Sequence, residues 1–310
     1  MSLWNPRRIA GASLLMFPMA TSLGCSENEI VAQPYDAVAV VAGDFDNVQL
    51  NLGRLDVAHA VYEGFIAGPA YEDGVDPEAL ALKAETLFTY VDDSGRAEIS
   101  RQDAVFINSG ARGFGKYTWN GVEADDQFLS DPETLANIAD FVEADGRTLI
   151  VSDWSYDIIE ALWPERVQFY GDEDDADGSP FDAAQVGSAG KVTATVTNDP
   201  LAIDLGAETM SVDFNYTNWT LVESVASDVD VYATADVSYR ISDTEGYADI
   251  NGVPLLLSFE AGQGRVIFSS FHWNTQTPGL SDALLVSMVD QLDLGSGSEQ
   301  EAEVTEDSGE

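Results

Sequence analysis

The chain has 310 residues, of which 55 are Asp or Glu and 13 are Lys or Arg, so its formal net charge is −42 at pH 7. A surface this acidic repels nucleic acid and anionic lipid, which excludes DNA and RNA as expected partners. The composition, 45% hydrophobic and 10% aromatic, is that of a globular protein rather than a disordered chain. The acids are spread along the chain, which favours adaptation to salty surroundings; specific binding of divalent cations is the alternative.

The first 24 residues have the pattern of a signal peptide. Arg7 and Arg8 precede an uncharged apolar stretch, residues 9–23. This stretch is interrupted by Pro18 and is short for a membrane-spanning helix, whereas its length suits the apolar region of an export signal. We therefore expect residues 1–24 to be removed on export.

The export signal ends in Ser22-Leu23-Gly24-Cys25, which resembles the lipobox of bacterial lipoproteins. The resemblance implies that Cys25 is lipidated and that residues 25–35 link the domain to the membrane. Ser26 follows, rather than Asp, so we expect the outer membrane or cell surface of a Gram-negative bacterium. An ordinary signal peptide with an incidental Cys25 is the alternative. Since Cys25 is the only cysteine, no disulfide can form within one chain.

The first half of the body alternates strand and helix patterns. Continuous apolar runs at residues 37–42, 104–108 and 148–152 predict strands buried on both faces. Between the last two runs, a capping box starting at Ser130, an apolar helical face and a terminal Gly146 predict a helix. A second helix is predicted from Ser155 to Leu162.

The second half is richer in β-structure. Three segments, at residues 191–197, 228–240 and 254–259, have strand patterns, and a glycine turn leads from the third into a strand at 265–271. A final helix is predicted over residues 281–292. Together these patterns predict one α/β domain, residues 36–293, with a doubly wound, mostly parallel sheet and additional β-hairpin structure in its C-terminal half. Residues 294–310, rich in acids and poor in apolar side chains, predict a disordered tail.

Four stretches resemble the class I glutamine amidotransferase-like superfamily: residues 38–44, 103–110, 141–155 and 262–274. The resemblance implies a flavodoxin-like sheet. It also implies a nucleophilic Cys on a Gly-flanked elbow after a central strand, activated by a His near the C-terminus. Here the corresponding strand runs into Val151-Ser152-Asp153-Trp154-Ser155, without Cys or Gly. We therefore expect amidotransferase activity to be absent.

His272 follows the apolar strand at 265–271 and is the main candidate for a functional side chain. It is interpreted either as a general base or pocket donor, or as a structural histidine that binds a loop. Ser152 and Ser155 are the candidate nucleophiles for such a base. However, Ser155 fits a helix N-cap equally well. Ligand contacts are expected from the crevice formed by the strand ends, namely from Ser109, Gly110, Asp153, Trp154, His272 and Asn274.

The acidic loop at residues 172–178 contains Glu173, Asp175 and Asp177 at alternate positions, as at the start of a calcium-binding loop. The twelfth position of such a loop is Ala184 rather than a bidentate Glu. Calcium is therefore the weaker interpretation, and no other cofactor is expected.

Two functions are consistent with these features. The first is a non-catalytic exported lipoprotein whose domain acts as a binding or assembly module at the cell envelope, with a small-molecule, glycan or protein ligand. The alternative is a divergent Ser/His-type or water-activating hydrolase of an extracellular amide, ester or glycan.

Overall fold

The computed structural model describes residues 38–64, 82–93, 95–119, 122–170, 184–242 and 244–291, all within one compact unit of the chain. The predicted signal peptide, Cys25 with its linker, the acidic loop at 172–178 and the tail at 294–310 lie outside these residues. Among the described residues, no helix is both long enough and apolar enough to cross a membrane.

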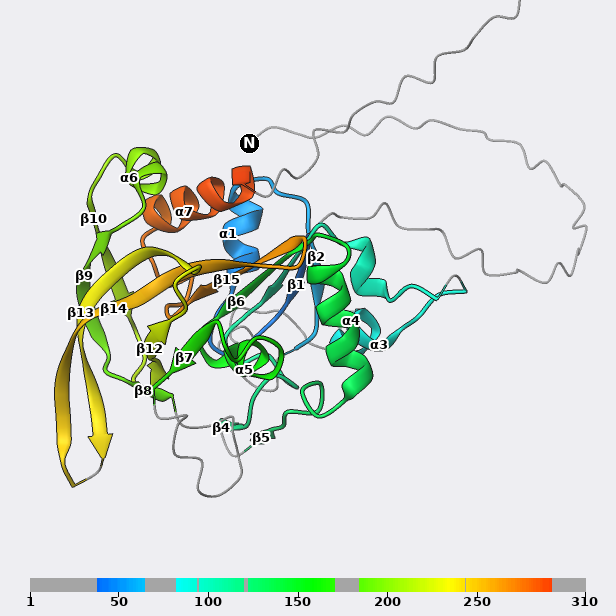
Figure 1. Cartoon of the computed structure of the whole chain (residues 1–310), viewed down its shortest axis with the longest axis horizontal. Coiled ribbons are helices and arrows are strands. Elements are labelled where there is room, and N and C mark those ends of the chain that lie inside the picture. Colours follow the sequence, from blue (N-terminus) through cyan, green and yellow to red (C-terminus); the bar gives the residue numbers. More distant parts are fainter. Residues whose placement is uncertain are drawn as a thin grey trace, which may run out of the picture. The chain divides into compact units, whose positions relative to one another are not determined.

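A parallel sheet forms the centre of the domain (Figure 1). Its strands are β1 (Val38–Val41), β2 (Ala60–Tyr62), β3 (Ala104–Ile107), β6 (Thr148–Ser152) and β15 (Gly264–Ser269). They lie in the order β2-β1-β3-β6-β15, and every neighbouring pair is parallel. In chain order this is the 2-1-3-4-5 arrangement of flavodoxin-like folds. The predicted doubly wound, mostly parallel sheet is confirmed.

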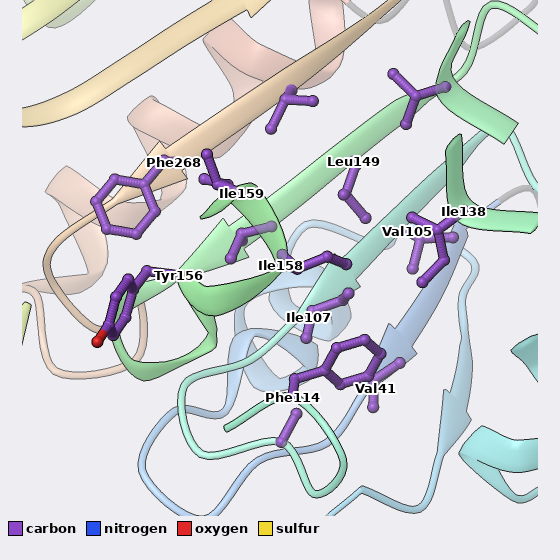
Figure 2. Packing of buried hydrophobic residues seen from close by; sticks show 14 of the residues in the cluster. Val41, Val105, Ile107, Phe114, Ile138, Leu149, Tyr156, Ile158, Ile159 and Phe268 are labelled. Carbon is purple, nitrogen blue, oxygen red and sulfur yellow. The ribbon is translucent and has the colours of Figure 1, made fainter. Parts of the chain in front are cut away.

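Helices cover both faces of this sheet. One face carries α1 (Val48–Arg54) and α7 (Pro278–Gln291); the other carries α3 (Ala84–Thr89), α4 (Pro132–Glu143) and α5 (Asp157–Leu162). Because strand side chains alternate, Val38 and Val40 pack into one hydrophobic cluster while Ala39 and Val41 pack into the other. Figure 2 shows the second cluster, where Ile138, Ile158 and Ile159 of the helices lie against the strand residues.

An antiparallel extension continues the sheet beyond β15. Strand β14 (Gly246–Ala261) pairs with β15, and then come β13 (Asp230–Ser242), β9 (Gly190–Val196) and β10 (Thr209–Phe214). The far ends of β13 and β14 project beyond the neighbouring strands (Figure 1). Thus the extra β-hairpin structure predicted for the C-terminal half is present. Shorter elements complete the domain: β4 (Tyr117–Trp119), β5 (Val122–Ala124), β7 (Val167–Phe169), β8 (Gln185–Gly187), α6 (Asp199–Leu205), β11 (Trp219–Thr220), β12 (Val222–Val225) and the 3₁₀ turn η2 (Glu98–Arg101).

The structure corrects two predicted helix caps. The N-cap of α4 is Asp131 rather than Ser130, because the Asp131 carboxylate accepts from the backbone N–H groups of Glu133 and Thr134. Ser155 does not cap the second helix. It lies in a 3₁₀ turn, η3 (Asp153–Ser155), and its hydroxyl donates to the carbonyl of Asn108 at 2.8 Å.

Candidate functional site

The site lies at the carboxyl edge of the parallel sheet, where the loops after β1, β3, β6 and β15 meet. These loops carry Asp46, Ser109, Asp153 and His272, all at most 5% exposed. Strands β1 and β3 are neighbours, but the chain leads from β1 to β2 on one side and from β3 to β6 on the other. The loops after β1 and β3 therefore diverge at this point of the sheet. In open α/β sheets this is the position at which ligands bind.

Two glycines allow the loops to approach closely. A Cβ atom on Gly43, just after β1, would lie 2.2 Å from the carbonyl oxygen of Ser109. Gly110 has a φ of 72°, and a Cβ there would lie 2.5 Å from the ring of Phe45. Both positions therefore require glycine, which brings the β1 and β3 loops into direct contact.

Asp153 is the first residue of η3 and lies in a strained turn directly after β6. Its φ is 44°, in the left-handed region that non-glycine residues rarely adopt. Asp is among the residues that tolerate this conformation best, which explains how an elbow forms here without a flanking glycine. One carboxylate oxygen, Oδ1, accepts from the backbone N–H of Thr220 at 2.6 Å. The turn thus directs the other oxygen, Oδ2, toward the β15 loop.

His272 meets Asp153 in a buried ion pair. Its Nε2 lies 2.8 Å from Asp153 Oδ2 and 3.2 Å from Ser109 Oγ, while the hydroxyl of Ser109 donates to the same Asp153 oxygen at 3.2 Å. On the other side of the ring, Nδ1 lies 3.2 Å from the Oδ1 oxygen of Asn215. Both ring nitrogens therefore face oxygen acceptors, an environment that suits an imidazolium.

The charges around His272 favour its protonated form. Burial is the largest single effect and lowers the pKa of His272, but the hydrogen bond to Asp153 and the negative charges of Asp153 and Asp46 together raise the pKa above its ordinary value of 6.5. A protonated histidine donates through both nitrogens and cannot accept a proton. The raised pKa and the facing oxygens of Asp153 and Asn215 therefore favour hydrogen-bond donation by His272.

Asp46, in the loop after β1, holds the same loops together by accepting hydrogen bonds from them. Its Oδ1 accepts from the backbone N–H groups of Asn47 and Asn274, at 2.7 and 3.1 Å. Its Oδ2 accepts from the N–H of Trp273 at 3.0 Å and from the hydroxyl of Ser152 at 3.1 Å. This carboxylate therefore holds the loop after β15, and with it His272, against β1 and β6.

A cavity of about 140 Å³ opens beside the ion pair. Asp153 and His272 line it together with Phe45, Trp154, Tyr216 and Asn218. The ring of Phe45 lies 4.7 Å from that of Trp154 and 6.0 Å from that of Tyr216, between ring centres. The cavity thus combines aromatic walls with a polar floor, as small-ligand sites do.

The structure places the other predicted site residues as follows. Asp153, Trp154 and His272 line the cavity, and Ser109 lies beneath it on the ion pair. Gly110 lies against the ring of Phe45, where there is no room for a side chain. Asn274 contributes its backbone N–H to Asp46, while its side chain is exposed.

The two predicted nucleophiles are engaged elsewhere. Ser152 Oγ accepts from the N–H of Ser109 at 2.8 Å and donates to Asp46, and Ser155 donates to the Asn108 carbonyl. The hydroxyl that the structure brings to His272 belongs to Ser109 instead. The calcium candidates Glu173, Asp175 and Asp177 lie outside the described residues. Among the described residues, no group of three or more His, Cys, Asp or Glu side chains is arranged to hold a metal ion.

Sequence reasoning missed Asp46, Phe45 and the Asn215–Thr220 segment. The first two had a usable signal, because Asp44-Phe45-Asp46-Asn47 follows the first apolar run after a single glycine, and strand ends of a parallel sheet meet at one edge. The segment from Asn215 to Thr220 comes from the antiparallel extension. No local pattern predicts that this extension folds back over the carboxyl edge.

The raised pKa of His272 predicts a stability that depends on pH. Because the folded-state pKa lies above 6.5, the ion pair contributes its full stabilisation below about pH 6.5 and loses it as pH rises through the folded-state value. The slope is at most about 1.4 kcal/mol per pH unit for one proton. We expect urea unfolding between pH 6 and 9 to show this decline, and His272→Gln to remove it. An unchanged slope in His272→Gln would assign the decline to other groups.

Comparisons with known proteins give no family. No protein-family model matches the sequence, and no curated protein matches it. Among solved structures, a GMP synthase-type protein from Thermoplasma acidophilum is 9% identical, with a TM-score of 0.44 over 84% of this chain and 96% of that one. PurLQS from Thermotoga maritima is 11% identical, with a TM-score of 0.45 over 82% and 98%. A β-galactosidase from Bacillus circulans is 11% identical, with a TM-score of 0.40 over 82% of this chain and 31% of the β-galactosidase chain. The fold class assigned above rests on the strand order and pairing.

Proposed function

We propose that this chain is a non-catalytic exported lipoprotein, and that its α/β domain is a binding module at the cell envelope. The ligand is a small molecule, or one small group of a glycan or protein, held in the cavity beside His272. The observation that carries the proposal is the contact between His272 Nε2 and Asp153 Oδ2 at 2.8 Å.

This contact places the acid, Asp153, on Nε2, which is also the ring nitrogen that faces the hydroxyl of Ser109. In a Ser-His-Asp triad the acid binds one ring nitrogen, and the other nitrogen is free to take the serine proton. Here Asp153 and Ser109 share Nε2, and the hydroxyl of Ser109 donates to Asp153 rather than to the imidazole. The arrangement therefore favours His272 as a fixed hydrogen-bond donor rather than a proton acceptor. This supports a binding role rather than a catalytic one.

The cavity supports a ligand-binding role. Its walls come from four separate segments of the chain, and Trp154 and Tyr216 are only partly buried. The indole N–H of Trp154 donates to the carbonyl of Asn218 at 2.5 Å, which fixes the ring. A cavity with fixed walls binds with a small entropic cost, because little of it must be ordered.

A screen of small fragments by heteronuclear NMR tests the binding role. We expect hits that shift the indole resonance of Trp154, and we expect Trp154→Leu to weaken these hits at least tenfold. Tyr247→Ala, on the projecting part of β14 and 64% exposed, is the control and should leave them unchanged. A screen in which no fragment shifts Trp154, or in which hits survive Trp154→Leu, would contradict the assignment.

A hydrolase remains the second candidate, because Ser109 Oγ does lie within reach of His272 at 3.2 Å. If ligand binding moved Asp153 away, Ser109 could donate to the imidazole and attack an ester or amide. Hydrolysis of p-nitrophenyl acetate and of L-glutamine discriminates the two functions. We expect wild type, Ser109→Ala and His272→Gln to have equal rates, whereas turnover lost in both variants would establish the hydrolase.

The export part of the proposal rests on the sequence before residue 26. In a Gram-negative host, we expect the wild-type chain to incorporate labelled palmitate and to sediment with membranes. Cys25→Ser should lose the label, while its folded domain should be unchanged. A wild-type chain that is unlabelled and released from membranes would remove the lipoprotein, though not the binding module.

A further inference from the structure

The aromatic side chains around the cavity form three walls of a box. The Phe45 ring meets the ring of Trp154 at 66° and that of Tyr216 at 64°, and all three residues line the cavity. The Tyr216 ring in turn lies 5.7 Å from the His272 ring, between ring centres. The face of an aromatic ring carries negative potential, so a space between several faces attracts a cation.

Buried carboxylates lie near the cavity at this edge of the sheet. Asp44 and Asp46 flank Phe45 in the chain and are 1% and 2% exposed, and Asp153 lies at the floor of the cavity. Asp153 pairs directly with His272 and so offsets its positive charge, and Asp46 accepts from the backbone N–H of the next residue, Trp273. The whole chain, with a net charge of −42, adds to the negative potential.

The cavity offers little to an anion. Both nitrogens of His272 already face Asn215 and Asp153, and the indole N–H of Trp154 donates to Asn218. An anion would have to displace these bonds while it lost its own hydration. A compact cation with apolar groups avoids this cost, because aromatic faces replace its weakly held water.

We propose that the Phe45-Trp154-Tyr216 box binds a small methylated ammonium group, either on a free molecule or at the end of a larger ligand. The cavity of about 140 Å³ matches a compact head group, since it corresponds to roughly five water molecules in the liquid. This inference rests on the proposed binding role of the same cavity and assigns its ligand class.

Titration with choline, and with its uncharged isostere 3,3-dimethyl-1-butanol, tests the proposal on the folded domain. We expect choline to shift the Trp154 indole resonance and to bind at least tenfold more tightly than the isostere. Phe45→Leu and Tyr216→Leu, which keep an apolar side chain but remove the ring, should each weaken choline at least fivefold. Tyr247→Leu should have no effect. Thermal unfolding of each variant shows that it is folded.

Each outcome is decisive. If the isostere binds as tightly as choline, or if only fragments other than these two shift Trp154, the cavity is a binding site but the ammonium assignment is wrong. If choline, the isostere and the fragment screen all leave Trp154 unshifted, the binding role of the cavity fails as well. If choline binds but Phe45→Leu and Tyr216→Leu retain its affinity, its site lies elsewhere and the box is excluded.

Discussion

Asp153→Ala is expected to lower the free energy of unfolding by about 3–5 kcal/mol, since it removes one partner of a buried ion pair. It leaves His272 without its carboxylate and the N–H of Thr220 without its acceptor. The control is Lys191→Ala, which breaks an exposed ion pair with Asp213 and should cost at most about 1 kcal/mol. Urea unfolding at pH 6, below the ordinary pKa of His272, measures both.

A second variant separates the ion pair from backbone strain. Asp153→Gly removes the same carboxylate, but glycine adopts a φ of 44° without a steric penalty. If the ion pair is what stabilises the site, Asp153→Gly is also strongly destabilised. If Asp153→Gly is as stable as the wild type, the carboxylate contributes nothing and the description of the site as a buried ion pair is wrong.

Asp46→Asn is expected to have the second large effect, a loss of about 3 kcal/mol or more. Both oxygens of Asp46 accept, from three backbone N–H groups and one hydroxyl. An amide presents a donor where one oxygen stood, so donors face donors in a buried position. Asp131→Asn is the matched control. It makes the same substitution at the partly exposed cap of α4, where Asn caps as well as Asp, so little change is expected.

Amide hydrogen exchange adds a local measurement to Asp46→Asn. The N–H groups of Trp273 and Asn274 should exchange much faster in the variant, because both donate to the lost carboxylate. Protection should be retained at the N–H of Leu135, which donates to the carbonyl of Asp131 in the first turn of α4. Equal exchange at Trp273 in both proteins would show that Asp46 does not hold the β15 loop.

The sequence predicted the central sheet because its strands are buried on both faces. Runs such as residues 104–107 and 148–152 contain apolar side chains at successive positions. This pattern is typical of a strand that is covered on both faces. Helix α4 was predicted for a similar reason, since twelve residues display a full apolar face. Helices α1, α3 and α6, with six or seven residues each, were not predicted, because so short a segment gives few positions for a helical period. The equally short α5 was predicted because Pro164 marks its end.

The site was only partly predictable. His272, Asp153 and Ser109 could be placed at one edge because each follows a strand of the parallel sheet. That Ser109, rather than Ser152, reaches His272 depends on side-chain directions within a turn, which spacing does not fix. The left-handed conformation of Asp153 gave no signal either, because the turn is stabilised by a contact with Thr220, distant in sequence. Tyr216 closes the cavity from a loop whose position depends on the antiparallel extension.

The protonation state of His272 tests the central claim most directly, and heteronuclear NMR of the imidazole nitrogens measures it. We expect both nitrogens to be protonated at pH 6, with the imidazole titrating above 6.5 in the wild type, and the signal to be lost in His272→Gln. A neutral ring at pH 6, with Nε2 unprotonated and facing Ser109, would contradict the account. It would make His272 a base, and the site a candidate for hydrolysis rather than for binding.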